Sequence, residues 1–123
     1  MTNQLQGELL FKGWDGTASL EATDWAYTPW MPVRGDIGTF GVQVLEITGV
    51  TLGWEVQTRT VEDPATLALL VAGTNITTVT TGTATNSTKA MQLVRYRFKT
   101  GSSATTTDFA IVRALQPSWE VNR

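Results

Sequence analysis

The stretch VTLGWEVQTR, residues 50–59, decides the fold class of this chain. Its large apolar side chains stand at every second position, and polar side chains stand between them. A period of two residues is the signature of a β-strand with one buried face and one wet face. The apolar face is expected to consist of Val50, Leu52, Trp54 and Val56.

A similar run precedes this stretch. Residues 40–47, FGVQVLEI, also alternate, and they change face near Val44 and Leu45, where a β-bulge is expected. The connector Thr48–Gly49 is short and contains glycine. It therefore predicts that residues 40–47 and 50–59 form a hairpin.

Two further strands are predicted towards the C-terminus. The run MQLVRYRFK, residues 91–99, and the run DFAIVRAL, residues 108–115, both alternate. The polar loop between them predicts a second hairpin. A weaker strand is expected over residues 4–11.

Three segments are less regular. Asp63 precedes a proline, which is typical of a helix start, so residues 63–71 are expected to form a strand or a short helical turn. In the Thr-rich residues 74–88, a strand is expected near residues 76–80 and then a loop, because β-branched side chains favour extended chain. Residues 23–35 combine large aromatics with prolines, which predicts an edge strand, an extended loop or an arm.

Together these patterns predict an all-β protein. Residues 1–123 are expected to form one antiparallel β-sandwich domain, of jelly-roll type, with short loops and an extended N-terminal or aromatic arm. A chain of 123 residues suits a single domain with one core.

Composition narrows the function. The chain has no cysteine and no histidine, which removes disulfides, thiolate metal sites and the commonest general base. Glu46 and Glu55 could form a carboxylate pair across the first hairpin, but we favour their interpretation as solvent-facing strand residues. We therefore expect no enzyme activity, no metal and no cofactor. A net charge of −2 and the lack of a long apolar stretch argue against nucleic acid and membrane as partners.

The best candidate site is an aromatic cluster, Trp25, Tyr27 and Trp30. On a strand, Trp25 and Tyr27 would face the same way. The cluster could anchor the protein in a neighbouring subunit, form a platform for sugar rings, or cover an open end of the sandwich. Met31 is expected to belong to the same partner-binding surface, and the N-terminal arm with Trp119 is expected to form a second patch.

A basic stripe, Arg95, Arg97 and Lys99, is expected on one face of the strand over residues 91–99. Like charges on one strand face repel unless acidic side chains neutralise them. We favour acids of the same chain, Glu55 or Glu62. Acids from another molecule would instead make the stripe, with Arg95 and Arg97, a docking face.

Three short motifs have simple interpretations. The tripeptide RGD at residues 34–36 is better explained by turn chemistry than by cell adhesion. The glycosylation sequons at Asn75 and Asn86 are expected by chance in a Thr-rich chain.

The character of the whole chain is similar to that of a known family. On the runs LGWEVQTR, residues 52–59, and LVRYRF, residues 93–98, it resembles the small β-sandwich decoration and cement proteins of tailed bacteriophage capsids. The resemblance implies a virion structural protein, made in the host cytoplasm and located on the capsid surface. Its partners would be the major capsid protein or another virion protein. The resemblance also implies a homo-oligomer, with a trimer favoured, and no catalytic residues.

Two alternatives stay open. A carbohydrate-binding module would stack the same aromatics on a glycan and would bind polysaccharide as an isolated monomer. A tail or baseplate protein of the same kind of particle would assemble in stacked rings rather than at repeated positions on a shell.

Overall fold

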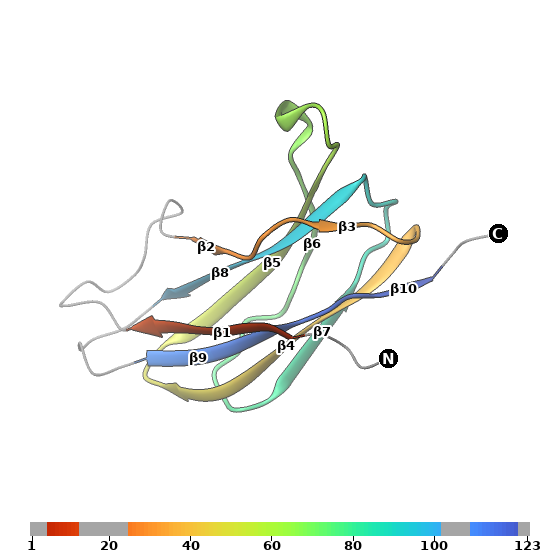
Figure 1. Ribbon diagram of the computed structural model, residues 1–123. Helices are drawn as coiled ribbons and strands as arrows, with labels where there is room; N and C mark the ends of the chain where they lie inside the picture. The colour runs from red at the N-terminus through yellow and green to blue at the C-terminus, as the bar shows by residue number, and fades with distance from the viewer. Residues whose placement is uncertain (1–4, 13–24, 102–108, 121–123) are drawn as a thin grey trace.

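The computed structural model describes residues 5–12, 25–101 and 109–120, which form two antiparallel sheets packed face to face (Figure 1). The first sheet contains β1 (Leu5–Lys12), β4 (Ile37–Thr48), β7 (Thr81–Thr85), β9 (Phe109–Leu115) and β10 (Ser118–Glu120). The second contains β2 (Ala26–Tyr27), β3 (Met31–Pro32), β5 (Thr51–Arg59), β6 (Ala68–Ala72) and β8 (Leu93–Gly101). The predicted β-sandwich is confirmed. Of the expected N-terminal arm, residues 1–4 lie outside the described residues.

Strands that pair are mostly distant in the sequence. In the first sheet, β9 lies between β1 and β4, and β4 also pairs with β7 and β10. In the second sheet, β8 pairs with β5 along one edge and with β2 and β3 along the other, while β6 closes the far edge of β5. Most strands therefore gain their ladder of hydrogen bonds from contacts that are distant in the sequence.

Both predicted hairpins are wrong. The chain crosses from one sheet to the other between β4 and β5, and again between β8 and β9. The alternation of a strand shows which face it buries but says nothing about its neighbour. Gly49, with a φ of 71°, supplies the tight turn between β4 and β5, a conformation that glycine adopts without strain.

The irregular segments resolve into short elements. The bulge near Val44 is confirmed, because the register between β4 and β9 shifts there. Asp63 caps the 3-10 turn η2 (Pro64–Thr66), and β6 follows it, so both expected structures occur. The strand expected over residues 76–80 is wrong, since Ile76 makes only an isolated bridge with Leu52 and the strand is β7. Among the described residues, no helix is long and apolar enough to cross a bilayer.

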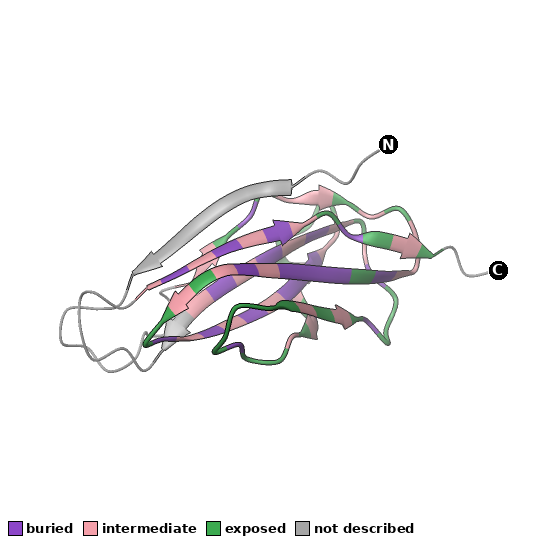
Figure 2. Ribbon diagram, turned by 90° about the horizontal axis from the view of Figure 1, so that it is seen from below, coloured by how far each residue is buried: buried purple, intermediate pink, exposed green. Residues whose placement is uncertain are grey.

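The core lies between the inner faces of the two sheets, where buried residues alternate with more exposed ones along much of β5, β8 and β9 (Figure 2). The four apolar residues predicted from the opening stretch are all buried. The centre of the core is aromatic. The ring centroids of Tyr96 and Phe98 lie 6.0 Å apart in a stacked arrangement, and the ring of Phe40 meets that of Tyr96 edge-on with its centroid 6.0 Å away. The largest fully buried side chains are Trp54, Tyr96, Phe40 and Phe98.

A buried hydroxyl joins the two sheets. The Tyr96 hydroxyl, on β8, accepts a hydrogen bond from the Gly41 N–H at 3.0 Å and donates one to the Leu115 carbonyl at 2.6 Å. Burial raises the pKa of this hydroxyl, although its hydrogen bond from Gly41 acts in the opposite direction. The hydroxyl therefore stays protonated and holds β8 against β4 and the end of β9.

Packing around Trp54 predicts the first measurable effect. A Cβ added at Gly73 would overlap the indole ring of Trp54, which is almost fully buried and has little room to move. Overpacking of this kind costs about 1–3 kcal/mol. We expect Gly73→Ala to lower the free energy of unfolding by that amount in urea titrations.

Gly53→Ala is the matched control for this substitution. Its added Cβ would meet the Asn75 Oδ1 at 3.4 Å, an ordinary contact. We expect its free energy of unfolding to change by less than about 0.5 kcal/mol, as is usual for substitutions away from the core. Equal destabilisation by the two substitutions would contradict the packing described for Trp54.

Candidate functional site: a cation–aromatic face

The site begins with the two faces of β8. Three consecutive inward side chains, those of Val94, Tyr96 and Phe98, are fully buried in the core. The side chains between them point to the outer face of the second sheet and remain partly exposed. These are the basic residues Arg95, Arg97 and Lys99. Because core packing fixes the strand, it also fixes where the cations emerge.

The edge strand beside β8 supplies the aromatics. It is interrupted between β2 and β3, where Thr28 turns inward: its N–H donates to the Tyr96 carbonyl and its hydroxyl accepts from the Tyr96 N–H, both at 3.0 Å. Pro29 follows and carries no N–H for a ladder. This extra residue acts as a bulge, so Trp30 faces outward together with Trp25 and Tyr27.

At one end of the outer face, two cations lie against Trp25. The Arg97 guanidinium carbon is 3.9 Å from the centre of the Trp25 ring, and the Lys99 Nζ is 4.7 Å from it. Both distances are within the range of cation–π attraction. Attraction of both cations to the Trp25 ring therefore offsets part of the repulsion between them.

At the other end, Arg95 lies against two rings. Its guanidinium carbon is 4.0 Å from the centre of Tyr27 and 4.4 Å from the centre of Trp30. Arg59, which comes from the end of β5, lies 5.5 Å from the Trp30 ring. We call the whole group the cation–aromatic stack; it consists of Trp25, Tyr27, Trp30, Arg59, Arg95, Arg97 and Lys99.

Polar groups of β5 hold the arginines from below. The Arg97 Nε donates to the Glu55 Oε1 at 2.8 Å, and the Arg97 Nη2 contacts the same oxygen. The Arg95 Nε donates to the Oε1 of the buried Gln57 at 2.9 Å. Burial, with the nearby charges of Arg97 and Arg59, lowers the pKa of Arg95, although Tyr27 acts in the opposite direction.

The acidic partners expected for the basic stripe are thus present in part. Glu55 neutralises Arg97, as expected of an acid from the same chain. Glu62 makes no ion pair with any described residue, and no carboxylate among the described residues lies within ion-pair distance of Arg95 or Lys99. The face therefore keeps an excess of positive charge.

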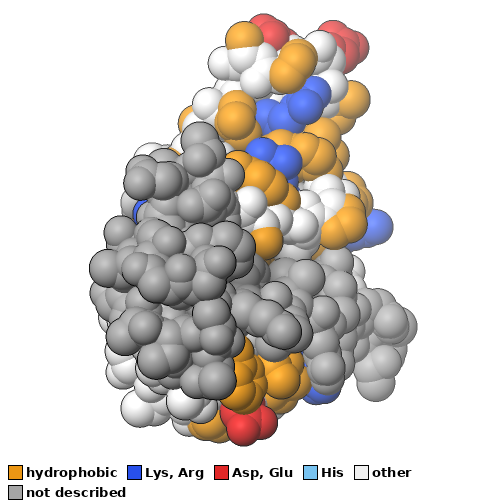
Figure 3. Space-filling model, turned by 90° about the vertical axis from the view of Figure 1, so that its left-hand side faces the viewer, with side chains coloured by type: hydrophobic (Ala, Val, Ile, Leu, Met, Phe, Trp, Pro, Cys, Tyr) orange, Lys and Arg blue, Asp and Glu red, His pale blue; other side chains and the backbone are white. Residues whose placement is uncertain are grey.

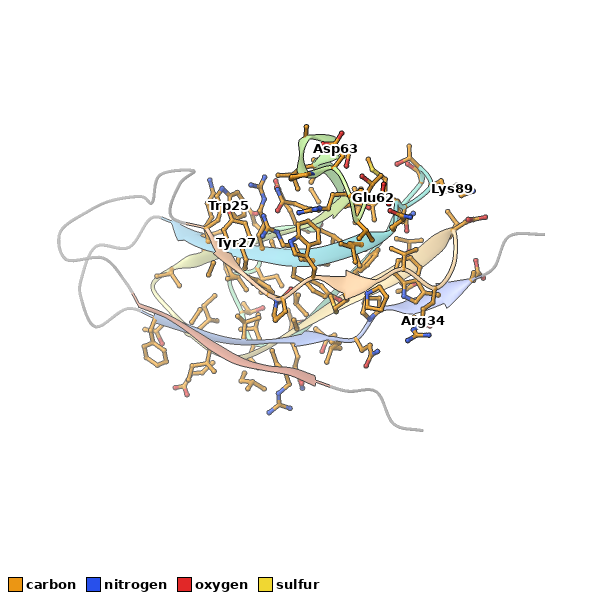
Figure 4. The ribbon with its side chains drawn as sticks, turned by 45° about the horizontal axis from the view of Figure 1, so that its top comes forward. Trp25, Tyr27, Arg34, Glu62, Asp63 and Lys89 are labelled. Carbon is orange, nitrogen blue, oxygen red and sulfur yellow. The ribbon has the colours of Figure 1, made fainter. Side chains whose placement is uncertain are left out.

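The surface views agree with this description. Figure 3 shows basic side chains lying among hydrophobic ones, with acidic side chains at the top of the view. Figure 4 shows Trp25 and Tyr27 side by side above the sheet, and Glu62 and Asp63 on the loop that projects beyond it. Tyr27 is 45% exposed, so the stack is open to a partner.

Other predicted site residues lie elsewhere. Met31 packs partly buried against the core, and Trp119 does the same from β10, with its ring edge-on to Phe40 at 5.5 Å. Glu46 lies on the first sheet and Glu55 on the second, so they do not form a carboxylate pair.

Two of the three short motifs, the RGD tripeptide and the sequon at Asn86, have structural roles, whereas Asn75 is exposed. The RGD motif lies in a bend, where a side chain at Gly35 would collide with the Glu120 carbonyl and where Asp36 faces Lys89 at 3.6 Å. Asn86 is buried: its Oδ1 accepts from the Gly38 N–H at 2.7 Å and its Nδ2 donates to the Asp36 carbonyl at 3.0 Å. This use of its amide makes the second sequon a structural residue.

Neither a metal-binding group nor a similarity to known proteins adds to this geometry. No group of three or more acidic side chains that could hold a metal occurs in the part of the chain that the structure describes. Comparisons with protein-family models, curated proteins and solved structures found no match for the chain. The cation–aromatic stack is therefore the feature on which a function has to be built.

A double-mutant cycle tests whether the stack contributes energy. For Arg95→Ala and Trp30→Ala, alone and together, we expect a coupling free energy of unfolding of about 0.5–2 kcal/mol, because the guanidinium is partly desolvated by two rings. Urea titrations of the four proteins give this value.

The exposed pair Lys89 and Asp36 is the reference cycle. Its side chains are 77% and 32% exposed and 3.6 Å apart, and such pairs contribute little. We expect a coupling below about 0.5 kcal/mol for it. A stack coupling no larger than this reference would show that the rings and the arginine do not interact in solution.

Proposed function

We propose that this protein works by contact and not by catalysis, as a structural protein of a bacteriophage particle. In the particular form that we favour, it is a decoration or cement protein that binds the assembled capsid as a homo-oligomer, with three copies expected. The observation that carries the proposal is the cation–aromatic stack, a rigid and partly exposed group of the residue types that dominate protein interfaces.

The strand order supports this proposal. Counting β2 with β3, and β9 with β10, as one interrupted strand each gives eight strands in the described part of the chain. They pair first with eighth, second with seventh, third with sixth and fourth with fifth. We infer that this rolled-up ribbon is a jelly roll, an architecture used by viral capsid proteins and by lectins. The fold alone does not assign a function.

The composition of the stack favours a protein partner. Trp, Tyr and Arg are the side chains most enriched among the residues that carry binding energy at protein interfaces. Here they are already held in place by the contacts of Arg95 and Arg97 with β5, so a partner does not have to order them. Preorganised side chains reduce the entropic cost of association.

The same geometry weighs against the carbohydrate alternative. Sugar rings stack on the flat face of an aromatic side chain, but each ring of the stack has a cation over its face, at 3.9 Å for Trp25, 4.0 Å for Tyr27 and 4.4 Å for Trp30. A glycan would have to displace these cations or use the opposite faces of the rings.

A cement protein of this kind would act by mass action. A protein that binds the assembled shell but not its free subunits stabilises the shell by its binding free energy. A stable contact of ordinary size buries roughly 1,200–2,000 Å².

Attachment to shells tests the proposed function. The probe is a shell assembled from the major capsid protein encoded by the same genome, sedimented with the protein. We expect Trp25→Ala combined with Trp30→Ala to weaken attachment by about thirtyfold or more, because an anchoring tryptophan contributes roughly 2 kcal/mol or more. The variant should keep its β-sheet circular dichroism spectrum, since neither ring lies in the buried core.

Val79→Ala is the matched control, because Val79 is 63% exposed and lies on the segment before β7. Its attachment should be unchanged. Failure of the unmodified protein to bind shells would contradict the proposal. Binding to polysaccharide as a monomer would replace it with the carbohydrate function, and decoration of tails in electron micrographs would replace it with the tail or baseplate role.

A further inference from the structure

The charged side chains on the outer face of the second sheet are unevenly distributed. At one end, the loop of residues 60–67 carries Glu62 and Asp63, both exposed. At the other end, Lys99 lies over Trp25 with no carboxylate of the described residues beside it. One sheet face thus carries acidic side chains at the loop and a lysine far from them; Figure 3 shows acidic side chains at the top of the view, with basic ones below them.

The acidic end is also apolar. Val61 is 55% exposed, Leu67 is 44% exposed, and Leu69 of β6 is 54% exposed beside them. Large apolar side chains that gather on a projecting loop are typical of an interaction site. The basic end offers the matching combination, because Trp25 places aromatic surface next to Arg97 and Lys99.

The 60–67 loop is built as a fixed shape. The Thr66 hydroxyl accepts from the Thr60 N–H at 2.9 Å and donates to the Asp63 carbonyl at 2.7 Å, while the Asp63 carboxylate accepts from the Ala65 N–H at 2.9 Å. Gln92 accepts from the Val61 N–H at 2.7 Å, which ties the loop to the segment before β8. A loop held by this many internal bonds can present side chains to a partner with little loss of entropy.

Glu62 and Asp63 cannot neutralise Lys99 of their own chain, because it lies too far away. Arg59, where the loop begins, is paired with Leu93 at the start of β8, and Lys99 lies six residues further along the same strand. Six residues of β-strand span about 20 Å, beyond the reach of any side chain and about two and a half times the Debye length at physiological salt. Glu62 and Asp63 can therefore neutralise a Lys99 side chain only on a second copy of the chain.

We propose that the 60–67 loop of one copy docks on the Trp25 and Lys99 end of the cation–aromatic stack of a second copy. Acid then meets base and apolar side chains meet aromatic ones at the same contact. The contact can be made twice in a two-fold pair or once per copy in a closed ring, and a ring of three gives the trimer expected above. This inference rests on the proposed function for its biological setting, but the self-association is measurable without a shell.

Exchanging the charges of Glu62 and Lys99 tests the proposed docking between two copies. The mass of the protein in solution is measured by sedimentation over a range of concentrations. We expect an oligomer, and we expect Glu62→Arg or Lys99→Glu alone to weaken self-association by about tenfold or more, because like charges then face each other across the contact. The double variant, which carries both substitutions, should regain most of the lost affinity because the two charges are exchanged.

Glu46→Arg is the matched control, since it makes the same charge change at an exposed position on the first sheet. It should leave self-association unchanged. A monomer at all concentrations, equal weakening by the control, or no recovery in the double variant would each overturn the inference. A monomer that still attaches to shells would overturn only this inference, whereas an oligomer that never attaches would overturn only the proposed function.

Discussion

The Tyr96 hydroxyl, buried between the sheets, is the interaction on which the rest of the structure depends. It connects β8 to the backbone of β4 at Gly41 and to the end of β9 at Leu115. A buried hydroxyl without partners would cost about 1–3 kcal/mol, so these bonds specify one relative placement of the two sheets. Since Arg95 and Arg97 flank Tyr96 on the same strand, the bond that closes the core also sets the position of the outer cations.

The edge strand shows how one irregularity produces the site. An uninterrupted strand would alternate strictly, so that Trp25 and Tyr27 would face outward and Trp30 inward. Thr28 and Pro29 shift the alternation by one residue and bring all three rings to the outer face. A broken edge with a proline also resists pairing with other chains, so a partner is expected to bind through side chains and not by adding a strand.

Much of the scaffold follows from the sequence, because burial of one strand face is a local property. Alternation identified the inward residues of β5 and β8 and the bulge near Val44. Strand partners did not follow, since they depend on long-range packing: β5 lies beside β8 rather than beside β4. The β7 strand was misplaced because a Thr-rich run lacks the large apolar residues that mark a buried face.

The site was predicted in two separate halves. The aromatics of residues 25–30 and the basic stripe on β8 are about seventy positions apart in the chain, and their contact follows only once the edge strand is laid beside β8. A signal for it was present: the three cations of the basic stripe outnumber the two acids, Glu55 and Glu62, that were expected to neutralise them, and an aromatic ring can attract a cation that has no acidic partner. Glu55 was correctly expected to answer one of these charges.

The cation–aromatic stack is expected to exist before any partner binds. Strand alternation, the hydrogen bonds of the Tyr96 hydroxyl and the interruption between β2 and β3 together hold its side chains in place. The most direct measurement is the nitrogen–proton correlation spectrum of the free protein, which resolves the Nε–H groups of its arginines. The account predicts that the Arg95 and Arg97 signals are displaced by the ring currents of Trp25, Tyr27 and Trp30 and exchange slowly with water, while the exposed Arg34 behaves as in an unfolded peptide. Arg95 and Arg97 signals that coincide with that of Arg34 would show that the surface is not preformed.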